Sequence, residues 1–281
     1  MMIGAIIGDI VGSRFEFNNH RDKSFDLFTE KCFATDDSVM TLAVAEAIMK
    51  TAETRPCLEE FDGEFHKLLA ENAVGSMQKI GRAYADSGYG ARFMNWVFSE
   101  DPKPYDSYGN GAGMRVSPAG FLAKNEREAL DLADTVTSVT HNHPEGIKGA
   151  RATALSIFLA RSGSSKDEIR RRVTGEYYPL DFTIDGIRGS YKFNESCQKT
   201  VPQAIECFLE STSFEDAIRI GVSLGGDTDT IGAINGAIAE AFYGVPQDVE
   251  EKALSYLDDR LRKIYDDWGI FLAGRPGPGR P

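Results

Sequence analysis

Two short acidic segments carry the residue types that bind divalent metal ions. They are residues 35–38, Thr-Asp-Asp-Ser, and residues 225–230, Gly-Gly-Asp-Thr-Asp-Thr, and each stands where a helix is expected to begin. Each offers two carboxylates and a threonine hydroxyl, the oxygen ligands that Mg²⁺, Mn²⁺ and Ca²⁺ prefer. Four carboxylates would balance two divalent cations, whereas without cations they would raise one another's pKa values. Either segment alone is equally consistent with a helix N-cap, because a carboxylate there accepts hydrogen bonds from free N–H groups.

The helix expected after Asp229 is unusually rich in small residues. A glycine inside a helix costs about 0.5–1 kcal/mol relative to alanine, so several of them need a reason. The pattern indicates close packing of another helix, close approach of a ligand, or both. The small residues are Gly232, Ala233, Gly236, Ala237 and Ala239.

Glu16 is a further candidate for acid–base chemistry, and it lies between Phe15 and Phe17. Its position in the sequence alone favours a surface ion pair. Burial beside the two aromatic rings would instead raise its pKa, which suits a general acid.

A loop rich in glycine and proline is predicted at residues 101–118. Within it, residues 109–113 read Gly-Asn-Gly-Ala-Gly, and this density favours a ligand-binding loop over simple turns. Downstream, His141 and His143 lack a third partner for zinc, so we interpret them as polar caps before a helix near residue 145.

Hydrophobic residues spaced three and four positions apart predict that most of the chain is helical. Thr35 and Asp36 can cap one helix, while Gly244 and Pro246 end another. Strand signals are few, and residues 173–193 are expected to form an irregular loop or a short hairpin. The predicted helices lie at about residues 37–50, 58–70, 126–138, 145–161, 200–210, 213–221, 229–243 and 248–266.

The fold class predicted from this pattern is all-α, with one compact domain over residues 1–273 and a disordered tail at 274–281. Three aromatic residues, Phe93, Trp96 and Phe98, are expected in the core rather than as a platform for a nucleobase.

Composition restricts the function further. The 281 residues include 31 basic and 43 acidic side chains, for a net charge of −12, which disfavours binding to nucleic acid or to anionic membranes. No apolar run is long enough to span a membrane, and the four cysteines have no zinc-like spacing, so reduced thiols in a cytoplasmic protein are expected. EF-hand, P-loop and dinucleotide-binding motifs are absent from the sequence.

Five sequence blocks spread over nearly the whole chain form a distinctive set. They are GAIIGDIVGSRFEF (4–17), TDDSVMTLA (35–43), SYGNGAGMRVSP (107–118), THNHPEGIKGARA (140–152) and SLGGDTDTIGAINGAIAEAFYG (223–244). In this order they resemble the ADP-ribosylglycohydrolase family. The resemblance implies an all-α hydrolase with a two-metal site at one end of the domain, which removes ADP-ribose from modified targets.

The resemblance also implies roles for individual residues. The implied metal ligands are Thr35, Asp36, Asp37, Asp227, Asp229 and Thr230. The implied catalytic residues are Glu16, Asp36 and Asp229, with Glu16 as general acid or base beside the metal ions. The implied substrate-binding residues, which hold the ADP-ribose diphosphate and its neighbourhood, are Ser107, Tyr108, Gly109, Asn110, Gly111, Gly113, Met114 and His141.

The expected cofactors are two divalent cations, with Mg²⁺ preferred and Mn²⁺ open. The expected partner is an ADP-ribosylated protein, modified on arginine or serine, or a small-molecule conjugate. Two alternatives stay open at this point: a protein that binds ADP-ribose without cleaving it, and a two-metal hydrolase of another nucleotide-type substrate.

Overall fold

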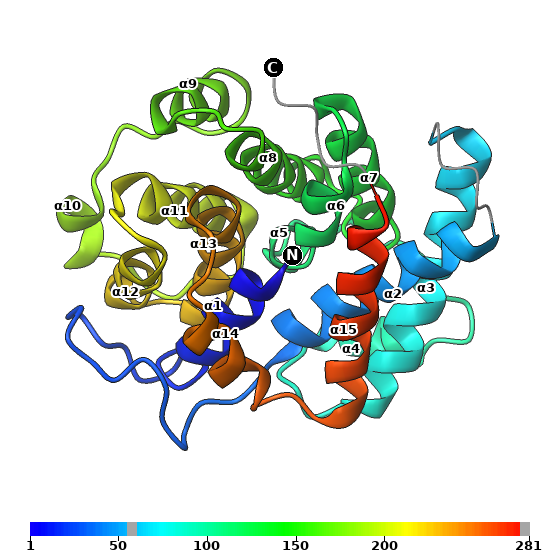
Figure 1. Ribbon diagram of the computed structural model, residues 1–281, viewed down its shortest axis with the longest axis horizontal. Helices are drawn as coiled ribbons and strands as arrows, with labels where there is room; N and C mark the ends of the chain where they lie inside the picture. Colours follow the sequence, from blue (N-terminus) through cyan, green and yellow to red (C-terminus); the bar gives the residue numbers. More distant parts are fainter. Residues whose placement is uncertain (55–60, 276–281) are drawn as a thin grey trace.

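The computed structural model describes residues 1–54 and 61–275, and this part of the chain folds into fifteen helices (Figure 1). It contains no strand; one isolated bridge pairs Gly109 with Ser196. The predicted all-α fold is confirmed. The helices are α1 (Ile3–Ser13), α2 (Asp36–Thr54), α3 (Gly63–Ala83), α4 (Ala91–Phe98), α5 (Gly111–Met114), α6 (Ser117–Leu122), α7 (Glu126–Ser138), α8 (Pro144–Arg161), α9 (Lys166–Glu176), α10 (Ile184–Arg188), α11 (Cys197–Glu210), α12 (Phe214–Leu224), α13 (Thr228–Tyr243), α14 (Gln247–Leu254) and α15 (Asp259–Ala273).

Helices α1 and α13 form the centre of the molecule. Every residue of α1 is buried, as is α13 from Thr228 to Glu240. Their backbones touch through glycines: a Cβ on Gly8 would overlap the carbonyl of Gly232, and a Cβ on Gly4 would overlap that of Gly236. The glycines after Asp229 therefore allow close packing of α13 on α1, which is one of the two roles predicted for them from the sequence.

The remaining helices surround this pair (Figure 1). Helices α8, α11 and α12 pack on α13, whereas α2 pairs with α3 and carries α15 on its other flank. The first helix of the chain and the thirteenth thus lie together, with the beginning of α2 next to them.

Most predicted helices are present, some with different ends. The helix at 126–138 is α7, and Gly244, with a φ of 75°, caps α13 as expected. The single helical segment at 248–266 is wrong, because the chain breaks at residues 255–258 and Asp258 caps a new helix, α15. Helix α3 begins only at Gly63, after an N-cap by Asp62; residues 55–60, including Cys57, lie outside the described part.

The hairpin considered for residues 173–193 is wrong, since this segment contains the end of α9 and all of α10. Phe93 and Trp96 are buried as expected, but Phe98 at the end of α4 is 53% exposed, so its assignment to the core is wrong. The three cysteines within the described residues, Cys32, Cys197 and Cys207, are buried and free.

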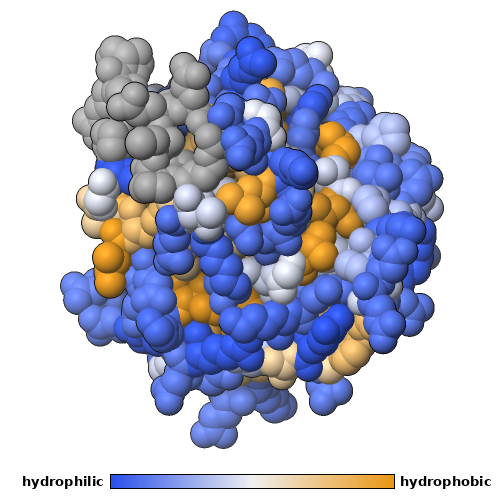
Figure 2. Space-filling view, turned by 90° about the vertical axis from the view of Figure 1, so that its right-hand side faces the viewer, coloured by the Kyte–Doolittle hydropathy of each residue, from blue (hydrophilic) through white to orange (hydrophobic). Residues whose placement is uncertain are grey.

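The face in Figure 2 is mostly hydrophilic, with small hydrophobic areas between the polar residues. Within residues 1–54 and 61–275, no helix has both the length and the apolar character needed to cross a bilayer. The tail predicted at 274–281 lies almost wholly outside the described residues, which end at Arg275.

Candidate active site

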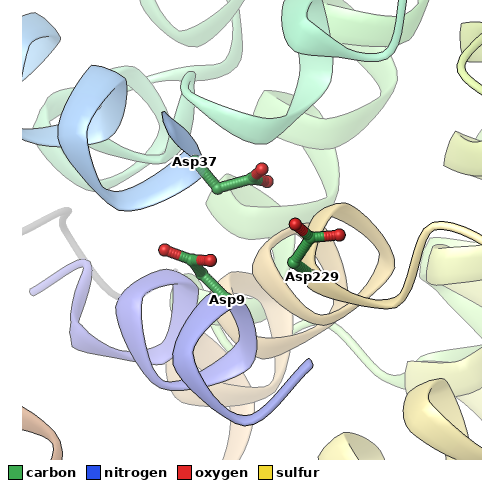
Figure 3. A group of neighbouring side chains, drawn as sticks. All are labelled: Asp9, Asp37 and Asp229. Atoms are coloured by element: carbon green, nitrogen blue, oxygen red, sulfur yellow. The ribbon is translucent and has the colours of Figure 1, made fainter. Parts of the chain in front are cut away.

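Three helices bring carboxylates together at one end of a cleft with a volume of about 340 Å³. Figure 3 shows Asp9 of α1, Asp37 of α2 and Asp229 of α13 as neighbours, with each side chain coming from a different helix. One carboxylate oxygen from each lies within 4.8 Å of the others, and the same holds for Glu16, Asp227 and Asp229. The two acidic segments, far apart in the sequence, therefore form one acidic cluster.

Asp9 is a member of this cluster that the sequence did not identify. It is fully buried and accepts hydrogen bonds from the backbone N–H and the hydroxyl of Thr35, at 2.9 and 2.7 Å, and from the backbone and hydroxyl of Ser38. Its carboxylate thus caps the beginning of α2 and holds Asp36 and Asp37 in place. The available signal was a lone carboxylate inside an otherwise apolar helix.

The second acidic segment is positioned by a glycine turn. Gly225 and Gly226 have φ values of 72° and 81°, which favour glycine, and the N–H of Gly226 donates to the Asn19 side chain. Immediately afterwards, the Thr228 hydroxyl donates to the carbonyl of Gly12 at 2.8 Å, which fixes the beginning of α13 on α1.

The carboxylates of this cluster lack positive partners. No ion pair within the described residues involves them, and one oxygen each of Asp37 and Asp229 is buried without a hydrogen-bond donor. Burial and mutual repulsion therefore raise the pKa values of Asp36, Asp37 and Asp229 well above the usual range. A buried carboxylate oxygen with no donor needs either a proton or a cation.

Glu16 lies at the edge of the same cluster. Burial, followed by the charge of Asp227, raises its pKa to about 7, while a hydrogen bond with Asp229 acts in the opposite direction. Glu16 is thus poised to gain or lose a proton near neutral pH. Asp9, whose burial outweighs its four hydrogen bonds, has a pKa raised to about 6.

The glycine-rich loop forms the other side of the cleft. Ser107, Gly109, Asn110, Gly111 and Met114 all line it. The Asn110 side chain donates to Asp227 at 2.6 Å, so the loop and the acidic cluster are directly connected.

Most backbone amides of this loop already have acceptors. Asn110 N–H donates to the Glu195 carbonyl at 2.7 Å, and Gly109 N–H donates to the Ser107 hydroxyl at 3.2 Å. Among the described residues the N–H of Gly111 has no acceptor, so a ligand can use it. The loop therefore offers fewer free amides than its glycine content suggests.

Positive charge gathers at this end of the cleft. Arg115 is 1% exposed, has no carboxylate partner, and stacks on Phe93 with its guanidinium carbon 5.5 Å from the ring centre. Its Nε has no partner, and burial lowers its pKa to about 10. Arg92 lines the cleft nearby.

His141 lies between Arg115 and the glycine loop. Its Nδ1 is 2.7 Å from the Thr140 hydroxyl, and burial together with the charge of Arg115 lowers its pKa well below the usual value. His141 is therefore neutral, and it lines the cleft. His143 accepts a hydrogen bond from the N–H of Glu145 and caps α8, as predicted.

The structure does not bring every candidate into the cleft. Tyr108 is 49% exposed and its ring packs edge-on against His143, while Gly113 faces Ile234 and Thr153 in the interior. Thr35 contacts Asp9, and Thr230, which lines the cleft, donates to Asp37 at 3.2 Å. Arg115 lies in the sequence block 107–118 and Phe93 was assigned to the core, whereas no motif marks the other cleft residues that the sequence did not identify. The cleft residues outside the predicted site are Gly88, Gly90, Ala91, Arg92, Phe93, Tyr105, Arg115 and Glu195.

The sequence and fold match known proteins. A family model described as ADP-ribosylglycohydrolase matches residues 1–277. ADP-ribosylarginine hydrolase Tri1 of Pseudomonas putida is 27% identical, over 94% of this chain and 76% of its own. ADP-ribosylhydrolase ARH3 of Homo sapiens is 25% identical, over 88% and 85%. A solved ADP-ribosylglycohydrolase-related protein complex shares the fold, with a TM-score of 0.66, 23% identity and 96% of both chains covered.

Proposed function

The chain belongs to the ADP-ribosylglycohydrolase family of glycosidic-bond hydrolases, and from this premise we propose that it removes ADP-ribose from arginine or serine side chains, or from small-molecule conjugates, with the help of two divalent cations. One observation carries the proposal: a single cleft joins an acidic cluster around Glu16 to a loop and a buried arginine that suit a diphosphate. Both parts of ADP-ribose, the reacting ribose and the diphosphate, thus have a matching surface.

The carboxylate oxygens at the acidic end of the cleft support the proposal of two bound cations. The orphaned oxygens of Asp37 and Asp229 are of the type that Mg²⁺ and Mn²⁺ bind. When bound, the cations would orient the ribose hydroxyls and lower the pKa of a water molecule. The residues proposed to hold them are Asp36, Asp37, Asp227, Asp229 and Thr230, with Thr35 and Asp9 supporting α2.

Glu16 is proposed to transfer the proton. Cleavage of a glycosidic bond passes through an oxocarbenium-like state, and a carboxyl group with a pKa near 7 can protonate the leaving atom or deprotonate the attacking water. Because Glu16 lies beside Asp227 and Asp229, a ribose bound at the proposed cation site would have its anomeric carbon close to Glu16.

The diphosphate is proposed to lie against Gly111 and Arg115. The free N–H of Gly111 and the uncompensated guanidinium of Arg115 supply a donor and a positive charge for the phosphate oxygens. Neutral His141, which also lines the cleft, adds a further polar contact. These contacts, remote from the reacting bond, position the ribose.

The test measures release of ADP-ribose from arginine-linked and serine-linked peptides, with Mg²⁺ and with EDTA. We expect metal-dependent release that Glu16→Ala reduces by about 10³-fold, within the usual range for loss of a general acid or base. Glu100→Ala, at an exposed position outside the cleft, is the matched control and keeps full activity. Tight ADP-ribose binding without release from any conjugate would indicate a binding protein, and neither binding nor release would refute the proposal.

A further inference from the structure

Two phenylalanines stack on each other in an exposed position beside the cleft. The rings of Phe17 and Phe193 are 5.8 Å apart between centres and inclined by 29°. Phe17 is 83% exposed and Phe193 40%, so both keep ring surface in water. An exposed aromatic pair of this kind gains little from folding and calls for another explanation.

Each ring neighbours a carboxylate that lines the cleft. Phe17 directly follows Glu16, and Phe193 stands two residues before Glu195. The two carboxylates are close enough for the charge of Glu195 to raise the pKa of Glu16. The aromatic pair is therefore at the side of the cleft where the proposed proton transfer takes place, and the segment of Phe193 adjoins the glycine-rich loop through the Glu195 carbonyl.

Hydrogen bonds that do not involve the rings hold the segment after Glu16 and the segment before Glu195 in place. Arg21 donates to the carbonyls of Tyr191 and Arg188, at 2.8 and 2.7 Å, and the Glu195 carbonyl accepts from Asn110 at 2.7 Å. Removal of a phenyl ring would thus leave the backbone around Glu16 and Glu195 in place, and the rings can be tested separately from the catalytic geometry.

We infer that Phe17, Phe193 and Glu195 form the subsite for the leaving group, and that they select a guanidinium over a neutral alcohol. This inference rests on the proposed function and specifies its substrate class. Glu195 lines the same cleft as Glu16, and each ring belongs to a residue within two positions of one of these carboxylates, so we place the leaving group of a substrate cleaved at Glu16 against these three residues.

The chemistry of the three side chains matches a planar cation. A guanidinium stacks on aromatic faces and forms charge-assisted hydrogen bonds with a carboxylate. Glu195 is exposed and makes no ion pair or side-chain hydrogen bond with the described residues, so its charge is available. The nearby Arg21 is occupied by backbone carbonyls, and a serine hydroxyl would gain neither the stacking nor the charge contact.

The experiment compares kcat/KM for two peptides that differ only in the modified residue, ADP-ribosylarginine or ADP-ribosylserine. The wild-type protein should prefer the arginine-linked peptide. Phe17→Ala and Phe193→Ala should each lower kcat/KM on that peptide about threefold to fivefold, and Glu195→Gln about tenfold, mainly through KM. Rates on the serine-linked peptide should change less than twofold.

Phe98→Ala is the matched control, because Phe98 is also exposed but does not line the cleft. ADP-ribose itself lacks the leaving group, so its Kd should stay the same in all four variants. A third substrate, ADP-ribosylagmatine, carries the guanidinium without a peptide. If the phenylalanine variants lower kcat/KM equally on this substrate and on the arginine-linked peptide, the subsite recognises the guanidinium alone, as inferred.

Two results would overturn the inference and leave the proposed function intact. One is a wild-type preference for the serine-linked peptide. The other is an equal loss on both peptides in the ring variants, which would assign the rings a structural role. Failure of the wild-type protein to release ADP-ribose from any conjugate would instead refute the proposed function itself.

Discussion

The two ends of the cleft carry opposite charges, and both carry them without compensation. At one end, buried carboxylates such as Asp37 and Asp229 have orphaned oxygens and no basic partner. At the other, the buried guanidinium of Arg115 has a free Nε and no acidic partner. The opposite charges line one cleft, and the charge of Asp36 acts on Arg115, but no ion pair within the described residues joins the two groups.

This difference indicates what each end is built to bind. Burying a charge without a partner costs free energy, so a protein keeps it only where a ligand supplies the partner. Cations would complete the acidic end and a diphosphate the basic end. Each end should therefore lower the stability of the ligand-free protein and strengthen ligand binding. Substitutions at one end at a time test this.

The largest effect is expected at the acidic end, for Asp229→Asn. The amide cannot replace the carboxylate as a cation ligand, so turnover should fall at least ~100-fold and stabilisation by Mg²⁺ should disappear. Without metal, the variant should be more stable than the wild type by about 1 kcal/mol, because one repelling charge is gone. Urea unfolding with EDTA and with Mg²⁺ measures both quantities, and a less stable metal-free variant would contradict the repulsion argument.

At the basic end, Arg115→Met should weaken binding of the ligand at that end, as Asp229→Asn does at the acidic end. Methionine has a similar length and no charge, and we expect ADP-ribose affinity to weaken by about 2 kcal/mol, or about 30-fold. Stabilisation by Mg²⁺ should remain, which is the reverse of the Asp229→Asn result. Isothermal titration calorimetry measures the Kd for ADP-ribose in the variant and the wild type. Unchanged affinity would show that Arg115 does not contact the diphosphate.

A smaller effect should come from the packing that supports the acidic end. Gly8→Ala places a methyl group against the backbone of α13, and overpacking of this kind typically costs 1–3 kcal/mol. Because Asp9 is the next residue, Mg²⁺ affinity should fall more than ADP-ribose affinity. The control is Gly75→Ala in α3, where a Cβ meets nothing within 4 Å and the change should be neutral or stabilising.

The smallest effect concerns pH and the basic end. His141 is neutral in the folded protein because burial and Arg115 lower its pKa, whereas the unfolded chain takes up a proton near the usual value of 6.5. The free energy of unfolding should thus fall as pH decreases below 6.5, by up to about 1.4 kcal/mol per pH unit from this group. His141→Gln should lose that part of the slope in urea titrations at pH 5.5 and 7.5. A slope that is the same in variant and wild type would show that His141 is protonated in the folded state.

The helical fold was predictable because its signals are local. Spacing of apolar residues and caps such as Gly244 gave α7 and α13, whereas the break before Asp258 was hidden by apolar residues that continue on both sides. The exposure of Phe98 could not be predicted from the residue type, since Phe98 is the last residue of α4 and the buried face of that helix consists of Phe93, Trp96 and Val97.

The candidate site was predictable where acids occur in pairs and hidden where they occur alone. Asp36–Asp37 and Asp227–Asp229 drew attention as motifs, and the fold brings them together. Asp9 has no motif; its role follows from three-dimensional contacts with Thr35 and Ser38. Arg115 follows the glycine-rich loop in the sequence, and only the fold shows that it is buried and forms no ion pair with the described carboxylates.

The pairing of α1 with α13 also constrains how the chain is made. Helix α1 ends at Ser13 and α13 begins at Thr228, so a ribosome working at about 5–20 residues per second needs roughly 10–40 s to deliver the partner. During this interval α1, which is wholly buried in the folded protein, lacks α13, the helix against which its backbone packs. Nascent chains stalled before α13 should therefore recruit chaperones through α1, and any fragment that ends earlier should aggregate.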